Sequence, residues 1–132
     1  NSTLHISEGQ NIILDMNEKT ISSNIDITIQ NEGNLTIIDS TSSGVGKISS
    51  TVGIAIENSG TLTLGQDDGT VSQDLITIEG NTYGIVNSGT FNFYDGTING
   101  ASAIQGVITN RPDGYVIRIT TVNGKERYYL ST

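Results

Sequence analysis

Cysteine and tryptophan are absent from this chain of 132 residues, which has one proline and one histidine. The absence of cysteine excludes disulfide bonds and thiolate metal sites. The lone histidine, His5, has no Ser or Asp context in the sequence, so a histidine-based catalytic mechanism is disfavoured. Ala and Leu, the strongest helix formers, number only 3 and 7. A helical fold is therefore not expected.

Basic residues are also scarce, because 6 Lys and Arg stand against 14 Asp and Glu and the net charge is −8. With no basic patch in the sequence, nucleic acid and anionic membranes are not expected as partners. The negative charge either attracts cations or serves solubility. No apolar run approaches the ~20 residues of a membrane span. No signal peptide is recognisable, and the chain starts in mid-pattern at Asn1, so we expect a fragment of a longer protein.

Residues that favour strands and turns are abundant. Ile, Val and Thr number 20, 7 and 17, a third of the chain, and β-branched side chains favour pleated surfaces. The 16 Gly and 13 Asn residues favour frequent turns, because Gly accepts a positive φ and Asn bonds its own backbone. The composition therefore predicts an all-β fold.

One stretch, NSGTFNFYDGTI at Asn87–Ile98, has two weaker copies at Asn58–Val71 and Asn31–Ile48. Each copy begins with an Asn-x-Gly turn, continues as a short apolar–polar–apolar strand, and passes through an acidic turn to Gly-x-Ile or Gly-x-Val. A repeated unit of turn and strand is typical of a solenoid, in which neighbouring units share one core.

Aligning the first Asn of each copy, which we call the corner Asn, predicts the register of the coils. Apolar residues recur two and four positions before Asn31, Asn58 and Asn87, and again four and six positions after them. By the same spacing Glu8 takes the corner position in a preceding coil and Asn110 in a following one. The corners are then 23, 27, 29 and 23 residues apart. With three short strands in each coil, we predict a right-handed parallel β-helix of about four to five coils.

The corner side chains are predicted to point inward and to stack. Stacked amides can bond the backbone of successive turns, so we expect a structural ladder; the alternative is that they contact a ligand. Glu8 would interrupt this ladder at the more solvated N-terminal edge. The predicted members are Asn31, Asn58, Asn87 and Asn110.

The C-terminal segment has a different pattern. Tyr115–Thr121 alternates, Asn123-Gly124 is the strongest short signal for a hairpin turn, and Arg127–Leu130 returns. We therefore assign residues 1–114 to the coils and residues 115–132 to a β-hairpin. The hairpin either caps the open strand edges of the last coil or joins it to a following module.

The hairpin also gathers half of the basic residues and three of the five tyrosines. An aromatic patch of this kind can bind sugars, whereas the alternative is a packed cap. The basic residues are Arg118, Lys125 and Arg127, and the candidate binding residues are Tyr115, Tyr128 and Tyr129.

An acidic residue follows the second strand of each coil. Carboxylates about 5 Å apart in one column would raise one another's pKa or bind a hard cation such as Ca²⁺. Calcium is the only cofactor that the sequence suggests. Asp beside Gly is equally a turn former. The predicted column consists of Asp15, Asp39, Asp67 and Asp95.

Two short stretches resemble catalytic motifs of β-helical enzymes that act on polysaccharides. Gly65–Asp68 resembles the paired-Asp motif of polygalacturonases, but the Gly-His-Gly and Arg-x-Lys motifs of that family are absent. Asn110–Pro112 resembles the catalytic Arg region of pectate lyases, without their tryptophan-containing motif. In such an enzyme the catalytic residues would be Asp67, Asp68 and Arg111.

A longer resemblance covers residues 4–108. Asn11–Ile21 resembles the LDLNGKTI opening of pectate-lyase-like β-helix modules, Leu35–Ser49 resembles the next part of that pattern, and Asn58–Ile98 resembles its NSGTLTI…DGTI coils. Such modules occur in large secreted or wall-anchored proteins of Gram-positive, often gut, bacteria, where the same coils serve lyases, adhesins and spacers. One residue departs from the pattern, because Glu18 stands where the modules have Gly.

The resemblance and the incomplete catalytic motifs together predict a non-catalytic segment of a secreted or cell-wall-anchored bacterial protein. We expect it to act outside the cell as a stalk or an adhesive module. Its expected partners are glycans or surface proteins and the flanking modules of its own chain. The alternatives are a fragment of a carbohydrate-active enzyme and a dedicated glycan-binding module.

Overall fold

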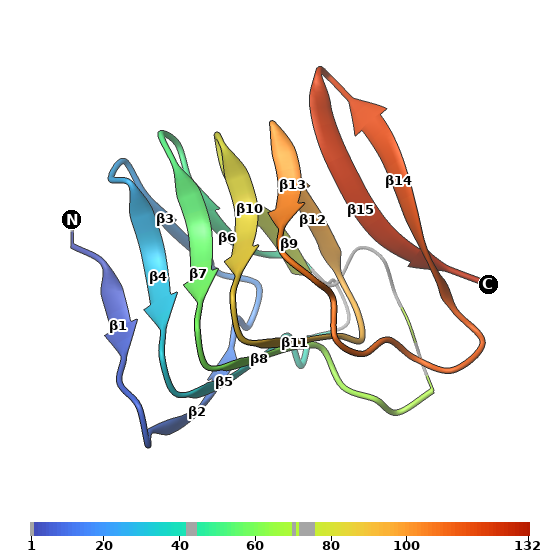
Figure 1. Ribbon diagram of the computed structural model, residues 1–132, viewed down its shortest axis with the longest axis horizontal. Helices are drawn as coiled ribbons and strands as arrows, with labels where there is room; N and C mark the ends of the chain where they lie inside the picture. The colour runs from blue at the N-terminus through green and yellow to red at the C-terminus, as the bar shows by residue number, and fades with distance from the viewer. Residues whose placement is uncertain (1, 42–44, 70, 72–75) are drawn as a thin grey trace.

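The computed structural model describes residues 2–41, 45–69, 71 and 76–132, which contain fifteen β-strands (Figure 1). No helix occurs in this part of the chain, and hence none that is long and apolar enough to cross a membrane. The strands form three sheets around one core. The prediction of an all-β fold is confirmed.

Strands of the coils return to the same sheet at every third step, so the chain winds as a parallel β-solenoid of about three turns. Sheet 1, at the front of Figure 1, contains β1 (Leu4–Ile6), β4 (Ile27–Asn31), β7 (Ile54–Asn58), β10 (Tyr83–Asn87) and β13 (Ser102–Gln105). Sheet 2 contains β2 (Asn11–Asp15), β5 (Asn34–Ile38), β8 (Thr61–Leu64) and β11 (Thr90–Phe93). Sheet 3 contains, in spatial order, β3 (Thr20–Ser23), β6 (Gly46–Ser50), β9 (Ile76–Glu79), β12 (Thr97–Gly100), β15 (Lys125–Ser131) and β14 (Val116–Val122).

The core consists of inward columns in which one residue of each coil lies against its equivalent in the next. Residues two positions before and four and six positions after Asn31, Asn58 and Asn87 are buried, as predicted. Leu62 and Phe91, for example, pair in register and have 0% exposed surface. Full burial of such a side chain contributes about 1.5–3 kcal/mol, so these columns supply a large part of the stability of the fold.

Residues four positions before each corner Asn were also predicted to point inward, and the structure corrects this. Ile27, Ile54 and Tyr83 are only half-buried, whereas the small residues that follow them are buried. Thr28, the first of these, donates from Oγ1 to the Ser49 carbonyl oxygen at 2.8 Å. The bend between sheets 3 and 1 therefore selects a small side chain one position later than predicted.

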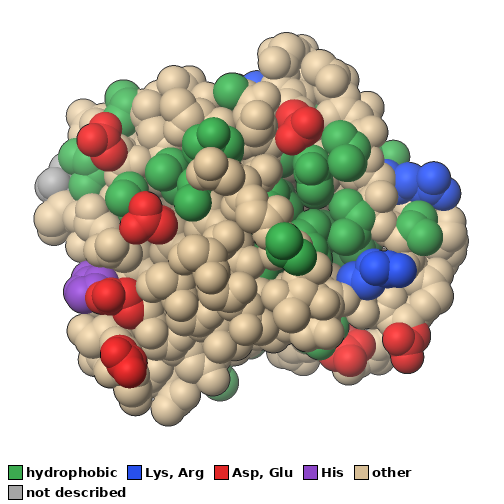
Figure 2. All heavy atoms as spheres, viewed as in Figure 1, with side chains coloured by type: hydrophobic (Ala, Val, Ile, Leu, Met, Phe, Trp, Pro, Cys, Tyr) green, Lys and Arg blue, Asp and Glu red, His purple; other side chains and the backbone are tan. Residues whose placement is uncertain are grey.

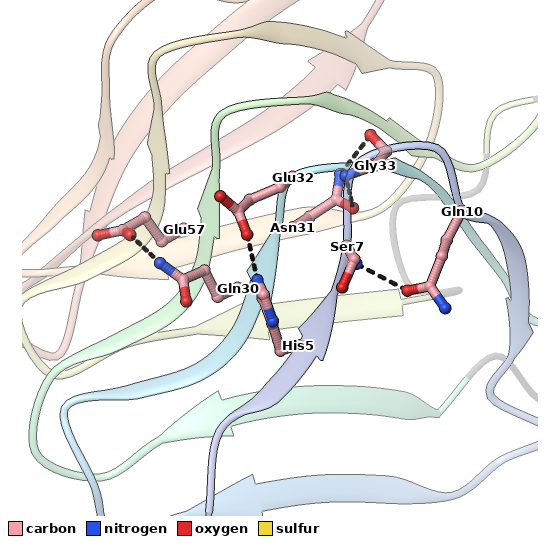
Figure 3. A network of polar contacts seen from close by, with 8 residues as sticks. All are labelled: His5, Ser7, Gln10, Gln30, Asn31, Glu32, Gly33 and Glu57. Atoms are coloured by element: carbon pink, nitrogen blue, oxygen red, sulfur yellow. Dashed lines mark hydrogen bonds and ion pairs between the residues drawn. The ribbon is translucent and has the colours of Figure 1, made fainter.

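The first corner of the solenoid also differs from the prediction. Strands β1 and β4 pair so that Ile6, and not Glu8, lies beside Asn31. The β2–β5 pairing keeps its predicted register, so two extra residues separate β1 from β2. They belong to a turn in which the Ser7 backbone N–H donates to Gln10 Oε1 at 2.7 Å (Figure 3). Glu8 is exposed in this turn and Ile6 is buried.

The last corner has moved as well. Val86 pairs with Gln105, so the residue beside Asn87 is Gly106 and not Asn110. The backbone segments at Asn87 and Gly106 approach so closely that a Cβ atom on Gly106 would lie 2.0 Å from the Asn87 carbonyl oxygen. A residue without a side chain is required at this point, and the last coil is shorter than predicted.

The predicted C-terminal hairpin is confirmed. Strands β14 and β15 pair antiparallel around Asn123 and Gly124, whose φ angles of 53° and 78° are the positive values of a type I′ turn. Strand β15 also pairs antiparallel with β12. The hairpin thus extends sheet 3, whereas sheets 1 and 2 contain neither of its strands.

The turn after β2 contains the residue that departs from the resembling pattern. Asn17 and Glu18 have φ angles of 48° and 66°, in the left-handed region that glycine adopts without strain. The backbone N–H of Asn17 donates to Asp15 Oδ1 at 3.1 Å, and that of Glu18 donates to Asp39 Oδ2 at 3.2 Å. These hydrogen bonds hold a turn in which a side chain costs about 1–2 kcal/mol.

Candidate functional site

Asn31, Asn58 and Asn87 form a buried hydrogen-bonded column at the corner between sheets 1 and 2, which we call the Asn ladder. Asn31 Nδ2 donates to Asn58 Oδ1 at 2.8 Å, and Asn58 Nδ2 donates to Asn87 Oδ1 at 2.7 Å. Asn58 Nδ2 also donates to the Thr90 carbonyl oxygen at 2.9 Å. Asn31 and Asn58 have no exposed surface. The ladder therefore pairs buried polar groups of successive turns.

Asn110, the fourth residue predicted for this column, is not part of it. Asn110 is exposed, and its Nδ2 donates to Asn92 Oδ1 at 2.7 Å. The C-terminal end of the ladder is closed by Asn87 Nδ2, which donates to the Val107 carbonyl oxygen at 2.7 Å. The short last coil thus replaces a side-chain acceptor with a backbone one.

The acids predicted to form a cation column have carboxylates that hold turns. Asp39 is buried and accepts from the backbone N–H groups of Thr41 and Gly46 at 2.9 and 3.1 Å. Burial raises the pKa of Asp39, but the hydrogen bonds outweigh this effect and leave the pKa below its usual value. Hydrogen bonds from Ser40 likewise lower the pKa of Asp15.

The four acids of the predicted column do not share one register. Asp15 pairs with the residue before Asp39, and one step along a strand turns a side chain to the other face. Asp39 and Asp95 line a cavity of about 220 Å³ together with Asp68, whereas Asp67 is exposed. Among the described residues, no three His, Cys, Asp or Glu side chains are placed to hold a metal ion. The predicted Ca²⁺ column is therefore not assembled in this part of the chain.

The alternative catalytic set is also divided. Asp68 lines the 220 Å³ cavity, beside the exposed Asp67. Arg111 lines a different hollow of about 310 Å³ formed by residues 109–115, and its Nε donates to the Tyr115 carbonyl oxygen at 2.9 Å. Neither hollow brings the two aspartates and the arginine together.

The three hairpin tyrosines do not present their rings on one surface. Tyr115 and Tyr128 pack against the core. Burial raises the pKa of Tyr128, with a smaller contribution from the negative charge of Glu126. Tyr129 follows Tyr128 in β15, so its ring is on the opposite face of sheet 3. A flat patch of three adjacent rings is therefore not formed.

The outer face of sheet 3 gathers basic residues from distant parts of the chain. One row across the sheet contains Arg118, Tyr129, Thr97, Thr77 and Lys47. The neighbouring row contains Thr120, Arg127, Asn99, Glu79 and Ser49. We use the name basic face for this surface with its four cations, Lys47, Arg118, Lys125 and Arg127.

The basic face corrects the sequence-based statement that the chain has no basic patch. Four of its six basic residues lie on this surface, and Glu79 is the one acid in the two rows. Figure 2 views the molecule from the side of sheet 1, away from the basic face; on this side acidic side chains lie over the solenoid, and both acidic and basic groups lie at the hairpin end. The charge of the molecule is therefore unevenly distributed.

A cavity of about 350 Å³ opens on the basic face beside the hairpin turn, and Glu79 lies in its wall. Lys125 Nζ donates to Glu79 Oε2 at 2.9 Å, and Lys47 Nζ is 3.5 Å from Glu79 Oε1. The hydrogen bond from Lys125 lowers the pKa of Glu79 against the opposing effect of burial, and Lys47 lowers it further. Glu79 is therefore ionised at neutral pH and holds both lysines in place.

Two other groups in the wall of this cavity have unused hydrogen-bonding capacity. Asn99 Oδ1 is buried and accepts no hydrogen bond from the residues that the structure describes. Within the same residues, the Arg127 guanidinium forms no ion pair. An unpaired buried acceptor costs about 1–3 kcal/mol. The cavity thus offers the Arg127 cation to an anionic group, with the polar Asn99 side chain in the same wall.

Sequence reasoning identified the three hairpin cations but missed Lys47, Glu79 and Asn99. Each lies in a short alternating stretch, one position from a buried isoleucine, so the period of two already marks it as outward-facing. Their proximity to the hairpin depends on β15 pairing with β12, which the sequence of the hairpin alone does not reveal.

Comparison with protein-family models, with curated proteins and with solved structures finds no match for this chain.

Proposed function

We propose that this chain is a non-catalytic segment of a secreted or cell-wall-anchored bacterial protein and acts outside the cell as a stalk with an adhesive face. The fold proposed with this function is a right-handed parallel β-helix of about four to five coils over residues 1–114, with the hairpin over 115–132. The five parallel strands of sheet 1 support the coil count. The strong preference of parallel strands for right-handed crossovers supports the handedness.

The way in which successive coils are joined supports the stalk. The Asn ladder, the backbone bonds of three sheets and continuous apolar columns connect each coil to the next. A solenoid built in this way is stiff along its axis, because bending it breaks several of these contacts at once. Such a segment holds its neighbours in the parent protein at a fixed distance.

The observation that carries the adhesive role is the pairing of Arg127 with Asn99 in the 350 Å³ cavity. Guanidinium groups bind oxyanions through two parallel hydrogen bonds. The Asn99 side chain in the wall of the same cavity would lie beside a hydroxyl group next to the oxyanion. An acidic glycan carries both groups on one sugar ring. The basic face therefore fits acidic glycans better than neutral ones.

Two alternatives have their own experimental signatures. A fragment of a carbohydrate-active enzyme that uses Asp67, Asp68 and Arg111 would release a product. A glycan-binding module built on its tyrosines would bind neutral sugars by stacking them on aromatic rings. The divided positions of both residue sets favour the basic face over either alternative.

A glycan panel with acidic and neutral members of matched size tests the proposal. The variants are Arg127→Ala and the control Arg111→Ala. The control also removes one positive charge, but Arg111 lies outside the basic face. We expect saturable binding of acidic glycans that Arg127→Ala weakens by about tenfold or more, since a charged hydrogen bond contributes about 1.5–3 kcal/mol. Arg111→Ala should leave it unchanged.

Other outcomes of the same panel reject the proposal. Exclusive binding of neutral glycans, or an equal loss in both variants, would remove the basic face as the binding site. Unsaturated or reducing-end products would identify the enzyme. Binding that requires Ca²⁺ would indicate a cation site formed by the predicted acidic residues, Asp15, Asp39, Asp67 and Asp95.

A further inference from the structure

Strand β14 is an unprotected sheet edge at the hairpin end of the molecule. Among the strands that the structure describes, it is the outermost of sheet 3 and pairs with β15 alone (Figure 1). Its exposed apolar residues are Val116, Ile119 and Val122, with 40%, 59% and 42% exposed surface. Edge strands are normally blunted by Lys, Pro or a bulge. Here Arg118 is the one charged residue of the strand.

The hairpin turn determines which backbone groups of β14 are free. Val122 and Lys125 flank a two-residue turn and form its closing hydrogen-bonded pair. Hydrogen-bonded and non-hydrogen-bonded positions alternate along an antiparallel strand. The N–H and C=O groups of Ile117, Ile119 and Thr121 therefore point away from β15, toward the free edge. A second strand would find them in a continuous row.

We propose that β14 is a self-association surface, on which a second copy of this chain pairs its own β14 in antiparallel orientation about a two-fold axis at Ile119. In this register Ile119 lies opposite its own copy, and Ile117 lies opposite the Thr121 of the second copy. Both are positions where the free backbone groups face each other. Each such pair exchanges two backbone hydrogen bonds.

The side chains of β14 are self-complementary in this register. Val116 lies opposite the Val122 of the second copy, Arg118 lies opposite Thr120, and Ile119 lies opposite Ile119. Apolar residues thus meet apolar residues, and no like charges are directly opposed, which cross-strand pairing favours. A two-fold interface requires this kind of self-complementarity.

Neighbouring registers do not have this property. An axis at Ile117 would place Val116 opposite Arg118 and leave Val122 without a partner strand. An axis at Thr121 would place Ile119 opposite the polar turn residue Asn123. An axis at Arg118 would place the two arginines directly opposite each other, and an axis at Thr120 would place Arg118 opposite Val122 and Ile117 opposite Asn123. The axis at Ile119 is therefore the one that β14 specifies.

The paired hairpins would join the two six-stranded sheets and bring the two basic faces side by side. The contact is small compared with stable dimer interfaces, so the dimer forms at high protein concentration. Each chain carries a net charge of −8, and two Arg118 side chains lie near the axis. Salt screens both repulsions, so association becomes stronger as ionic strength rises.

Sedimentation equilibrium over a concentration series is the first test. We expect the average mass of the wild-type chain to rise from 14.0 kDa toward twice that value, and to rise further in salt. Ile119→Lys should abolish the rise, whereas Val107→Lys, at an even more exposed apolar residue outside β14, should not. A wild-type chain that stays monomeric would overturn the proposal.

Cysteine cross-linking tests the register, because the natural chain has no cysteine. Across the axis, Ile119→Cys would place its two Cα atoms about 5.5 Å apart, within the range of about 4.4–6.8 Å that disulfides span. Val116→Cys would place them about 20 Å apart. Mild oxidation should therefore cross-link Ile119→Cys, should leave Val116→Cys alone monomeric, and should cross-link an equal mixture of Val116→Cys and Val122→Cys.

Two results of the cross-linking would overturn the proposal. Equal cross-linking of Val116→Cys and Ile119→Cys would show collision without a register. Cross-linking of Ile13→Cys in place of Ile119→Cys would locate the contact at the opposite end of the solenoid, where Ile13 is 73% exposed on the edge strand β2.

Discussion

The central coils and the two ends of this solenoid bury the same kinds of residue to very different extents. One inward column runs from Ile12 through Leu35 and Leu62 to Phe91. Ile12, in the edge strand, is 40% exposed, whereas the other three have no exposed surface. A residue in a central coil has a neighbour on both sides, and a residue in an end coil has only one.

Polar groups show the same contrast. Asn58 is bonded to a corner Asn on either side and has no exposed surface. Asn110, on the outside of the last coil, makes a similar amide–amide bond to Asn92 but is exposed to water. Burial therefore decides how much the same hydrogen bond contributes, because water can replace the exposed bond and cannot replace the buried one.

The largest expected difference between centre and end concerns the inward column. Phe91→Ala should lower the free energy of unfolding by about 3–5 kcal/mol, because it opens a cavity beside Phe93, whose ring stacks on it at 5.7 Å between centroids. Ile12→Ala, in the same column at the open edge, should cost about 1 kcal/mol. Urea unfolding of both variants measures this difference, and equal costs would mean that the edge coil is as well packed as the centre.

The Asn ladder gives the next largest effect. Asn58→Ala should cost about 2–3 kcal/mol, because it leaves buried groups of Asn31, Asn87 and Thr90 without a partner. Asn110→Ala removes one exposed amide bond and should cost less than about 0.5 kcal/mol. Thermal unfolding with calorimetry compares the two. A ladder without energetic importance would give similar values for both.

Glu18→Gly should act in the opposite direction and stabilise the protein by about 0.5–1 kcal/mol. Glycine removes the strain of the left-handed φ of 66°, and part of this gain is lost to the greater freedom of glycine in the unfolded chain. Glu8→Gly, in the exposed turn of the same coil, is the matched control and should give no gain. A loss of stability in Glu18→Gly would show that the Glu18 side chain has a role in the turn.

The smallest expected effect concerns the ion pairs of Glu79 with Lys47 and Lys125, which connect the coils to the hairpin. The folded state lowers the pKa of Glu79, so its interactions stabilise the protein above the unfolded pKa of about 4.3. This stability is lost as the pH falls through the lower, folded pKa. The difference in unfolding free energy between the wild type and Glu79→Gln should therefore be present at pH 7 and disappear in acid. A difference that does not change with pH would contradict the ion pairs with Lys47 and Lys125.

The central coils could be predicted from the sequence because they repeat. The Asn-x-Gly turn and the period of two recur in three copies, and each copy confirms the register of the others. Repetition predicts that Leu35, Leu62 and Phe91 lie in the core. The hairpin turn at Asn123 and Gly124 is not repeated, but the local turn chemistry of Asn-Gly predicts it.

The ends could not be predicted in this way because each has a single copy of its corner. Two extra residues in the first corner place Ile6 where the spacing predicted Glu8, and the short last coil places Gly106 where it predicted Asn110. The basic face was missed for a related reason. Lys47 joins the hairpin cations through pairings between strands that are distant in sequence, and no local pattern encodes them.

Native-state amide hydrogen exchange tests whether the ladder makes the inner coils one cooperative unit while the ends remain open. The Thr61 and Thr90 amides bond to carbonyl groups of the preceding coil, whereas the Gln10 and Tyr115 amides bond within local turns. We predict that the first pair exchanges only on global unfolding and that Asn58→Ala accelerates both members together. Exchange of Thr61 as fast as that of Gln10, or an effect of Asn58→Ala on one coil alone, would show that the ladder does not join the inner coils into one unit.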